Sequence, residues 1–286
     1  MDLLLLGLLL ATVPLADVDV GHEEVFGFVG TRVVKRGESL IEIAREHGVG
    51  FNAIAAANPG LDPFVPSPGA TLTIPTAWIV PRAATPGQIV VNVSEMRLYL
   101  LPGGGGSPLT FPVGVGMDEW KTPLGSFTVV RKTTNPTWYP PASIRREDPE
   151  LPAAVPPGPD NPLGTHALRL SQGSILIHGT DQPFGVGRKA SHGCIRLYPE
   201  DIPRLFDVVP LETRVTMVRE PFKAGLRGGR VYVEVHDDRD ARINLRTAAR
   251  RLLDKRGLTA RVDTRRLQAA LEARRGVPVD VSLEGL

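Results

Sequence analysis

The chain has 286 residues, a hydrophobic fraction of 42% and a formal net charge of only +2, so it is long enough for two modest domains and has no overall charge favouring nucleic acid. Its 30 glycines and 27 prolines, with 6% aromatic residues, are typical of short strands joined by turns rather than of a helical bundle. The apolar run 3–11 is too short to span a bilayer. We interpret residues 1–16 as a secretory signal peptide, although Asp2 stands where a basic leader is usual. A buried N-terminal helix is the alternative.

Residues 31–75 are predicted to form a compact strand–helix–helix–strand unit, after a short strand within residues 17–30. Ser39 and Glu42 form a capping box at the start of the first helix. The closing strand follows a turn rich in proline and glycine. We therefore expect a small βααβ domain here.

This unit resembles the LysM module. The run from Val33 to Leu40 matches the module's strand-Gly-acid-Ser-Leu opening, and Asn58-Pro59 and the final strand match its later segments. The resemblance implies binding to glycan that contains N-acetylglucosamine, as in peptidoglycan or chitin. A structural βααβ domain without a ligand is the alternative, because a fold alone does not fix a function. A linker, residues 76–87, follows.

Residues 88–218 are predicted to form a domain made mostly of strands. The expected strands cover 89–93, 96–100, 109–115, 127–131, 167–170, 174–177 and 213–218, with one short helix at 199–207. A proline-rich loop, 135–163, interrupts them. A loop of this length is usually functional, so we expect it to form a lid or substrate wall with Trp138 and Tyr139 facing the ligand. A mobile insertion is the alternative.

The C-terminal region, 219–286, is predicted to contain a strand at 231–235 and a basic helical extension. From residue 241 onward there are eleven Lys and Arg against five Asp and Glu. Leu245, Ala249, Leu252 and Leu253 share one helical face. We favour helices packed against the domain with a solvated basic face. Contact with anionic wall polymer or membrane headgroups is the alternative.

Cys194 is the only cysteine, and it follows His178 and His192 in the chain. An unpaired thiol in an exported protein is a liability unless it is buried or used. It becomes a strong nucleophile only with a base or a positive field nearby. We expect His178 to be that base, with the carbonyl of Gly179 orienting its ring, and His192 to be a second candidate.

Two neighbours of Cys194 suggest further parts of a thiol site. Gly193 lets the backbone approach a substrate closely, so amides at Gly193 and Cys194 could form an oxyanion hole. Arg196 could hold a carboxylate or tune the thiolate. Zinc binding by His178, His192 and Cys194 is the first alternative, although a fourth ligand is missing. A buried structural cysteine is the second.

The sequence here resembles the L,D-transpeptidase (YkuD) catalytic domain. The segments His178-Gly179-Thr180 and Ser191-His192-Gly193-Cys194-Ile195-Arg196-Leu197 match its signature, and residues 122–127 and 161–164 match further segments. Together with the LysM-like unit, nearly all of residues 31–235 resembles the periplasmic ErfK/YbiS/YcfS/YnhG subgroup. The resemblance implies an α+β chain with a mostly-β, β-sandwich-like catalytic domain and short C-terminal helices.

The same resemblance implies a reaction without a cofactor or metal, in the periplasm. Cys194 would attack the carbonyl before the terminal D-alanine of a peptidoglycan stem tetrapeptide, and an amine would resolve the thioester. That amine would belong to diaminopimelate of a second stem or to a lysine of an outer-membrane lipoprotein. We expect Ser191, Arg196 and Trp138 to contact substrate. Two alternatives remain: a hydrolytic enzyme that uses water, and a non-enzymatic wall-binding protein.

Overall fold

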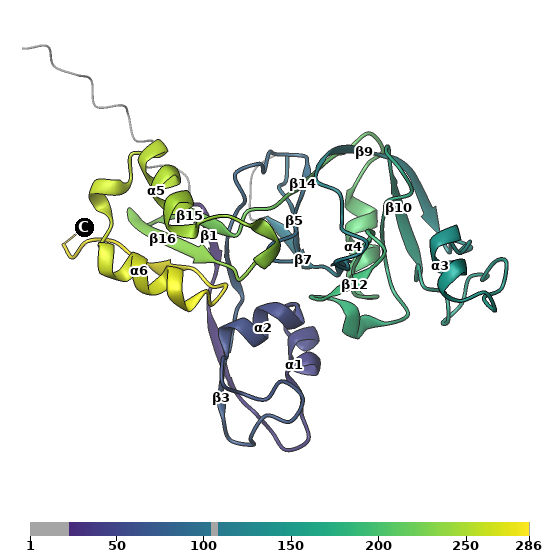
Figure 1. Ribbon diagram of the computed structural model, residues 1–286, viewed down its shortest axis with the longest axis horizontal. Coiled ribbons are helices and arrows are strands. Elements are labelled where there is room, and N and C mark those ends of the chain that lie inside the picture. Colours follow the sequence, from purple (N-terminus) through teal and green to yellow (C-terminus); the bar gives the residue numbers. More distant parts are fainter. Residues whose placement is uncertain (1–22, 104–107, 286) are drawn as a thin grey trace, which may run out of the picture.

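The computed structural model describes residues 23–103 and 108–285, so the predicted signal peptide lies outside the described residues. The described residues gather around three hydrophobic cores. Figure 1 shows them as three lobes, with the lobe of α1 and α2 packed beneath the other two. Within the described ranges, no helix combines the length and apolar character needed to cross a membrane. The mixed α+β class, with strands in the majority, is confirmed.

The N-terminal lobe has the predicted βααβ order. It consists of β2 (Gly30–Val33), α1 (Leu40–Glu46), α2 (Phe51–Ala57) and β3 (Thr71–Ile74), with β2 and β3 paired antiparallel. The capping box is present: the Glu42 amide donates to Ser39 Oγ and the Ser39 amide donates to Glu42. It satisfies amides that the first helical turn leaves without intrahelical partners.

The predicted linker, 76–87, is partly structured. Within it β4 (Ala77–Ile79) pairs with β1 (Val25–Gly27). The Ile79 backbone also bonds to the C-terminal lobe: its amide donates to Glu234 (2.6 Å) and its carbonyl accepts from Lys223 Nζ (2.6 Å). The chain between the first two lobes is therefore held in place rather than free.

The middle lobe is built on an eight-stranded mixed sheet in the order β13-β11-β10-β9-β14-β5-β6-β7. Its strands are β5 (Ile89–Asn92), β6 (Arg97–Leu100), β7 (Leu109–Pro112), β9 (Gly125–Thr134), β10 (His166–Leu170), β11 (Leu176–His178), β13 (Ile195–Arg196) and β14 (Arg214–Val218). A separate ladder pairs β8 (Val115–Gly116) with β12 (Lys189–Ser191). Helix α4 (Asp201–Val208) packs on β10 and places Ile202 and Leu205 in the core.

The proline-rich segment 135–163 is folded onto itself. It contains α3 (Ala142–Glu147), and Trp138 and Val155 exchange backbone hydrogen bonds. The buried Asn161 amide donates to the carbonyls of Pro136, Val155 and Pro156. Because prolines supply no amide donors, the Asn161 side chain provides donors that the many prolines of this segment lack, and it holds residues 136 and 155–156 together.

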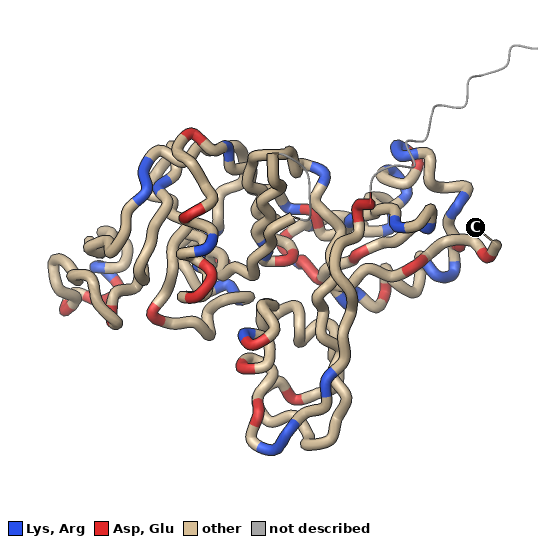
Figure 2. The backbone as a smooth tube through the Cα atoms, turned by 180° about the vertical axis from the view of Figure 1, so that it is seen from behind, with Lys and Arg blue, Asp and Glu red and all other residues tan. Residues whose placement is uncertain are grey.

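The C-terminal region is a domain-like lobe, larger than the single strand and helices expected from the sequence. Its sheet consists of β15 (Phe222–Arg227), β16 (Arg230–Val235) and β17 (Val279–Asp280), and its helices are α5 (Leu245–Lys255) and α6 (Thr264–Ala273). The helices pack on this sheet as favoured above, with Ala249, Leu252 and Leu253 in the core. Figure 2 shows acidic positions among the basic ones in this lobe. Ion pairs such as Arg274–Asp237 partly neutralise the excess.

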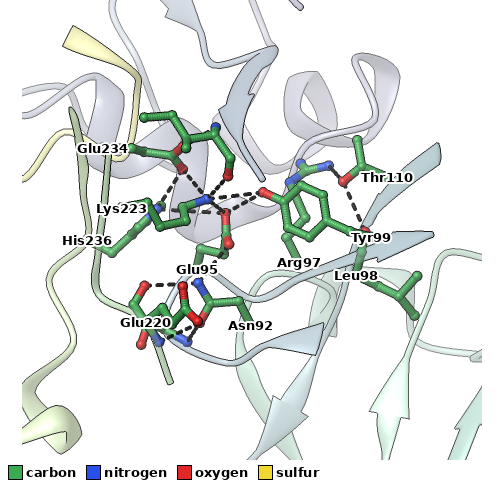
Figure 3. Close-up of polar contacts among 12 residues, drawn as sticks. Asn92, Glu95, Arg97, Leu98, Tyr99, Thr110, Glu220, Lys223, Glu234 and His236 are labelled. Atoms are coloured by element: carbon green, nitrogen blue, oxygen red, sulfur yellow. Dashed lines mark hydrogen bonds and ion pairs between the residues drawn. The ribbon is translucent and has the colours of Figure 1, made fainter. Parts of the chain in front are cut away.

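A buried ionic cluster joins the middle and C-terminal lobes (Figure 3). Lys223, 1% exposed, donates to Glu95 (2.8 Å) and Tyr99 (3.2 Å) and pairs with Glu234 (3.0 Å). His236 Nε2 lies 2.8 Å from Glu234. Taking both carboxylates out of water is costly unless they are paired in this way, so the cluster fixes how the two lobes dock.

The N-terminal lobe docks on the segment between His178 and Cys194. The backbone amide of Asn52 donates to the Gly187 carbonyl (3.1 Å). An added Cβ at Gly187 would lie 2.2 Å from the backbone nitrogen of Phe51. Gly187 also has φ +76°, a conformation that favours glycine. The contact therefore requires a glycine at this position.

Candidate functional site

Strands β11 and β13 bring the two halves of the candidate site together. They pair in parallel, with Ile177 opposite Ile195 and His178 opposite Arg196. Both isoleucines are fully buried on the core side. Since side chains alternate along a strand, His178 and Arg196 lie on the other face, and continuing the alternation puts Cys194 there too. The strand pairing thus brings residues that are separated by a long loop to one face of the sheet.

His178 is held by burial and by one main-chain contact. It is 4% exposed, and its Nδ1 lies 2.6 Å from the carbonyl oxygen of Gly179. With Nδ1–H donating to this carbonyl, Nε2 is left free to accept a proton. Burial and, secondarily, the Arg196 charge lower the pKa of His178 to about 3. The imidazole is therefore neutral at physiological pH, the state that a general base needs.

Packing around Gly179 explains the glycine after the histidine. An added Cβ would lie 3.0 Å from the Ile202 side chain of α4 and 3.3 Å from the Leu163 carbonyl. A larger residue would push the carbonyl that orients His178. The Gly179 carbonyl lies 2.6 Å from His178 Nδ1, and its orienting role in the reaction stays a prediction.

Cys194 is unpaired and half-buried. Its Sγ accepts from the Leu176 amide (3.4 Å) and lies 3.7 Å from the Ser174 carbonyl, to which it donates. Burial raises the pKa of the thiol, and the Leu176 amide and the charges of Arg196 and Arg169 oppose that rise. The pKa of the thiol is therefore raised in the free protein, where the His178 imidazole is neutral, so the structure gives no sign of a preformed thiolate–imidazolium pair.

The loop before Cys194 is fixed by hydroxyl groups. Ser191, 1% exposed, accepts from the Gly193 amide (3.1 Å) and donates to the Cys194 carbonyl (2.6 Å). Thr122 Oγ1 donates to the Gly193 carbonyl (3.1 Å), and Gly193 has φ +102°. The Ser191 hydroxyl thus shapes the loop through its one proton and one of its lone pairs, and the Gly193 amide donates to it, so a substrate contact by Ser191 stays a prediction. Among the described residues the Cys194 amide has no acceptor, so it is the candidate oxyanion donor.

His192 contacts the proline-rich segment, and its role as a second candidate base stays a prediction. Its Nε2 lies 3.1 Å from Glu147 at the end of α3, and its ring lies 5.4 Å from that of Trp120. Trp120 and Glu147 were not predicted from the sequence. Trp120 does, however, lie two residues before the matched segment 122–127. His192 thus connects segment 135–163 to the nucleophile loop.

Arg196 and Arg169 bring positive charge to the face of Cys194. Arg196 exchanges backbone hydrogen bonds with Gly114 (2.8 and 3.0 Å), and its buried Nε has no partner among the described residues. Arg169 is exposed and pairs with Leu176 across β10 and β11, so alternation places it on the same face as Cys194. The sequence missed Arg169 because the hairpin register decides its face.

Trp138 is placed in the proline-rich segment without a described link to the nucleophile. It is half-buried and its backbone pairs with Val155. None of the hydrogen bonds or ring contacts described for it reaches His178 or Cys194. Tyr139 beside it is 70% exposed. A substrate contact by Trp138 therefore stays a prediction.

Zinc binding by the three residues weighed as ligands does not fit the described geometry. His178, His192 and Cys194 do not converge: within the described part of the chain, the group whose ligand atoms lie within 4.8 Å of one another is Glu95, Glu234 and His236. Figure 3 shows the Lys223 ammonium among those atoms, which fills the place of a cation. The zinc alternative is therefore wrong for this geometry.

Known proteins match the chain over both the N-terminal and the middle lobes. Residues 86–217 match the family model described as the L,D-transpeptidase catalytic domain, and residues 33–75 match the LysM domain. The chain is 41% identical over 263 residues to the probable L,D-transpeptidase YcfS of Escherichia coli strain K12, covering 86% of this chain and 81% of that protein. It is 40% identical over 261 residues to the probable L,D-transpeptidase ErfK/SrfK of Salmonella typhimurium strain LT2, covering 86% and 83%. It is 43% identical over 206 residues to the probable L,D-transpeptidase YbiS of E. coli K12, covering 70% and 67%.

Proposed function

The chain belongs to the L,D-transpeptidase family and carries a LysM domain, and from that premise we propose how its residues act on peptidoglycan. The donor is a stem tetrapeptide, and the bond cleaved is the one before its terminal D-alanine. Cys194 is the nucleophile and His178 the general base. The observation that supports this most is the His178 ring, which is neutral, fixed by the Gly179 carbonyl and on the face of Cys194.

In the first half-reaction Cys194 Sγ attacks the donor carbonyl carbon while its proton passes to His178 Nε2. The carbonyl oxygen becomes an oxyanion, and the Cys194 amide is placed to donate to it. The tetrahedral intermediate then collapses: the C–N bond breaks, the imidazolium returns the proton to the leaving nitrogen, and D-alanine departs. A thioester on Cys194 remains.

In the second half-reaction an acceptor amine attacks the thioester carbonyl. His178 takes the amine proton and returns it to the sulfur as the C–S bond breaks, so a new amide forms and the thiol is restored. The neutral starting pair suits this cycle, because each half-reaction begins with a free base and a protonated nucleophile. The acceptor is an amine of a second stem, such as diaminopimelate, or a lysine of an outer-membrane lipoprotein.

The LysM domain would hold the protein to wall glycan, which places the reaction outside the cytoplasmic membrane, in the periplasm. The domain is docked on the segment that leads to Cys194 through Asn52 and Gly187. Its glycan site would then keep a fixed position relative to the nucleophile. A pull-down on purified sacculi tests the binding, and Cys194→Ala should bind as well as the wild type.

The reaction is tested with a purified disaccharide-tetrapeptide. Wild-type protein should release D-alanine and form cross-linked dimers, and Cys194→Ala and Cys194→Ser should do neither while remaining folded. Retained release by either variant would overturn the role of Cys194. Product masses with and without an added amine separate transfer from hydrolysis, the outcome expected of a carboxypeptidase or a lipoprotein-detaching hydrolase.

Intact-protein mass after exposure to a carbapenem gives a second, substrate-independent test. The wild type should gain one acyl adduct, and Cys194→Ala should gain none. Absence of the adduct together with absence of D-alanine release would favour the wall-binding protein without enzymatic activity.

A further inference from the structure

We propose that Asp240 of the C-terminal lobe is a positioning residue for the Cys194 loop, acting through Lys121 and Lys189. The inference rests on the proposed function. Asp240 lies outside residues 86–217, the region that matches the catalytic domain. It gives the C-terminal lobe a role in the reaction that the catalytic domain alone would lack.

The Asp240 carboxylate bridges two segments of the middle lobe. Its Oδ1 lies 3.0 Å from Lys121 Nζ and its Oδ2 lies 2.7 Å from Lys189 Nζ. Lys189 Nζ is also 2.5 Å from Asp118. The two lysines lower the pKa of Asp240 to about 2, so this carboxylate is ionised at neutral pH.

Each of these lysines is adjacent in the chain to groups that hold the nucleophile loop. Lys121 stands between Trp120, whose ring packs on His192, and Thr122, whose hydroxyl donates to the Gly193 carbonyl. Lys189 begins β12, which ends at Ser191. The Asp240 bridge therefore fixes the two walls between which the Ser191–Cys194 turn is formed.

The opposite end of the bridge is itself anchored. The Asp240 amide donates to Asp238 (3.0 Å), and Asp238 accepts from Ser94 Oγ (2.6 Å) and from Arg219 (2.7 Å). Ser94 follows β5, and the next residue, Glu95, belongs to the buried cluster in Figure 3. Asp240 thus extends from a rigid interface rather than from a free loop.

Loss of the Asp240 carboxylate removes a negative charge that neutralises the ammonium groups of Lys121 and Lys189. A cavity of about 160 Å³ lined by Lys121, Lys189, Arg219 and Asp240 adjoins them, and both lysines are partly exposed, at 49% and 37%. They can therefore separate and let residues 120–122 shift away from Gly193. Because partly exposed ion pairs contribute modestly, we expect a graded change rather than an inactive protein.

The experiment compares full-length Asp240→Asn, Asp240→Glu and the matched control Asp237→Asn. Asp237 is in the same turn but pairs with Arg274 within the C-terminal lobe. For Asp240→Asn we expect kcat for D-alanine release to fall by about three- to tenfold with KM little changed. Asp240→Glu should recover most of the rate, and Asp237→Asn should match the wild type.

Alkylation of Cys194 by iodoacetamide provides a readout that needs no peptidoglycan. With the loop less firmly held, the half-buried thiol of Asp240→Asn should react about threefold faster or more at the same pH, while the thermal midpoint stays within about 2 °C of wild type. Added salt at 0.5 M should move the wild type toward the variant and change the variant less, because salt screens the exposed charges of the Asp240 bridge.

The proposal is overturned if Asp240→Asn keeps wild-type kcat and alkylation rates, or if Asp237→Asn changes both as much. It is also overturned if the changes follow a loss of thermal stability that Asp240→Glu does not recover. If wild type releases no D-alanine, the proposed function fails, and the alkylation series still decides the role of Asp240.

Discussion

The depressed pKa of His178 predicts an acid-sensitive stability that one substitution should remove. The folded protein holds this imidazole neutral down to a pKa of about 3, whereas an unfolded chain binds the proton near 6.5. Protonation therefore favours the unfolded state. The stability that comes from neutral, buried His178 is fully present above pH 6.5 and is lost as the pH falls from 6.5 toward 3.

The size of this loss follows from the two pKa values. At pH 5 the pH lies about 1.5 units below the pKa of the unfolded histidine, so protonation stabilises the unfolded chain by ~2 kcal/mol. The folded chain gains almost nothing, because its His178 is still neutral at this pH. His178→Gln has no such group. Its free energy of unfolding should fall by ~2 kcal/mol less than that of wild type between pH 7.5 and pH 5. Asp201, whose pKa burial raises to about 6, acts in the opposite direction, but it is present in both proteins and cancels.

Urea unfolding followed by tryptophan fluorescence at the two pH values measures this difference. A difference below ~0.5 kcal/mol would refute the reasoning, as would an NMR titration of His178 with a midpoint near 6.5. Iodoacetamide alkylation of Cys194 gives a kinetic check, because a neutral thiol whose pKa is raised by burial predicts one rise in rate, at a pH above the ordinary range for a thiol. A plateau reached near pH 6 would instead indicate a thiolate–imidazolium pair.

Three further substitutions test the packing that supports the site. Lys223→Met leaves the buried carboxylates uncompensated and should lower the free energy of unfolding in urea by about 3–5 kcal/mol. The double variant with Glu234→Gln should recover part of this loss. A loss under ~1 kcal/mol would contradict the buried pairing. Gly187→Ala places a Cβ against Phe51 and should detach the LysM domain from the middle lobe. Proteolysis between the lobes should then be faster, and the radius of gyration from solution scattering should be larger. An unchanged proteolysis rate and radius would contradict the docking. Gly193→Ala, at φ +102°, should cost about 1–2 kcal/mol of strain and slow D-alanine release at least tenfold, whereas wild-type rates would show that the loop tolerates a side chain.

Local chemistry made much of this protein predictable from its sequence. The capping box at Ser39, the alternating strands and the amphipathic helix from Leu245 depend on neighbours in the chain, so their pattern is written in the sequence. Cys194 and His178 could be singled out because the chain has only one cysteine, and His178 ends an apolar strand and is followed by a glycine. The resemblances to the LysM module and to the catalytic domain could also be seen in the sequence, because their motifs are short and contiguous, and both were confirmed.

Contacts between distant segments were decided only by the tertiary structure. The face of Arg169 depends on hairpin register, the direction of His192 depends on where α3 brings Glu147, and the use of Ser191 depends on the fold of the turn around Gly193. The C-terminal lobe is the largest example. Its sequence shows only a strand and basic helices, because the side chains that join it to the rest of the protein are paired across more than a hundred residues. The chemistry of the nucleophile was thus contained in the sequence, whereas the groups that hold it in place are assembled by packing.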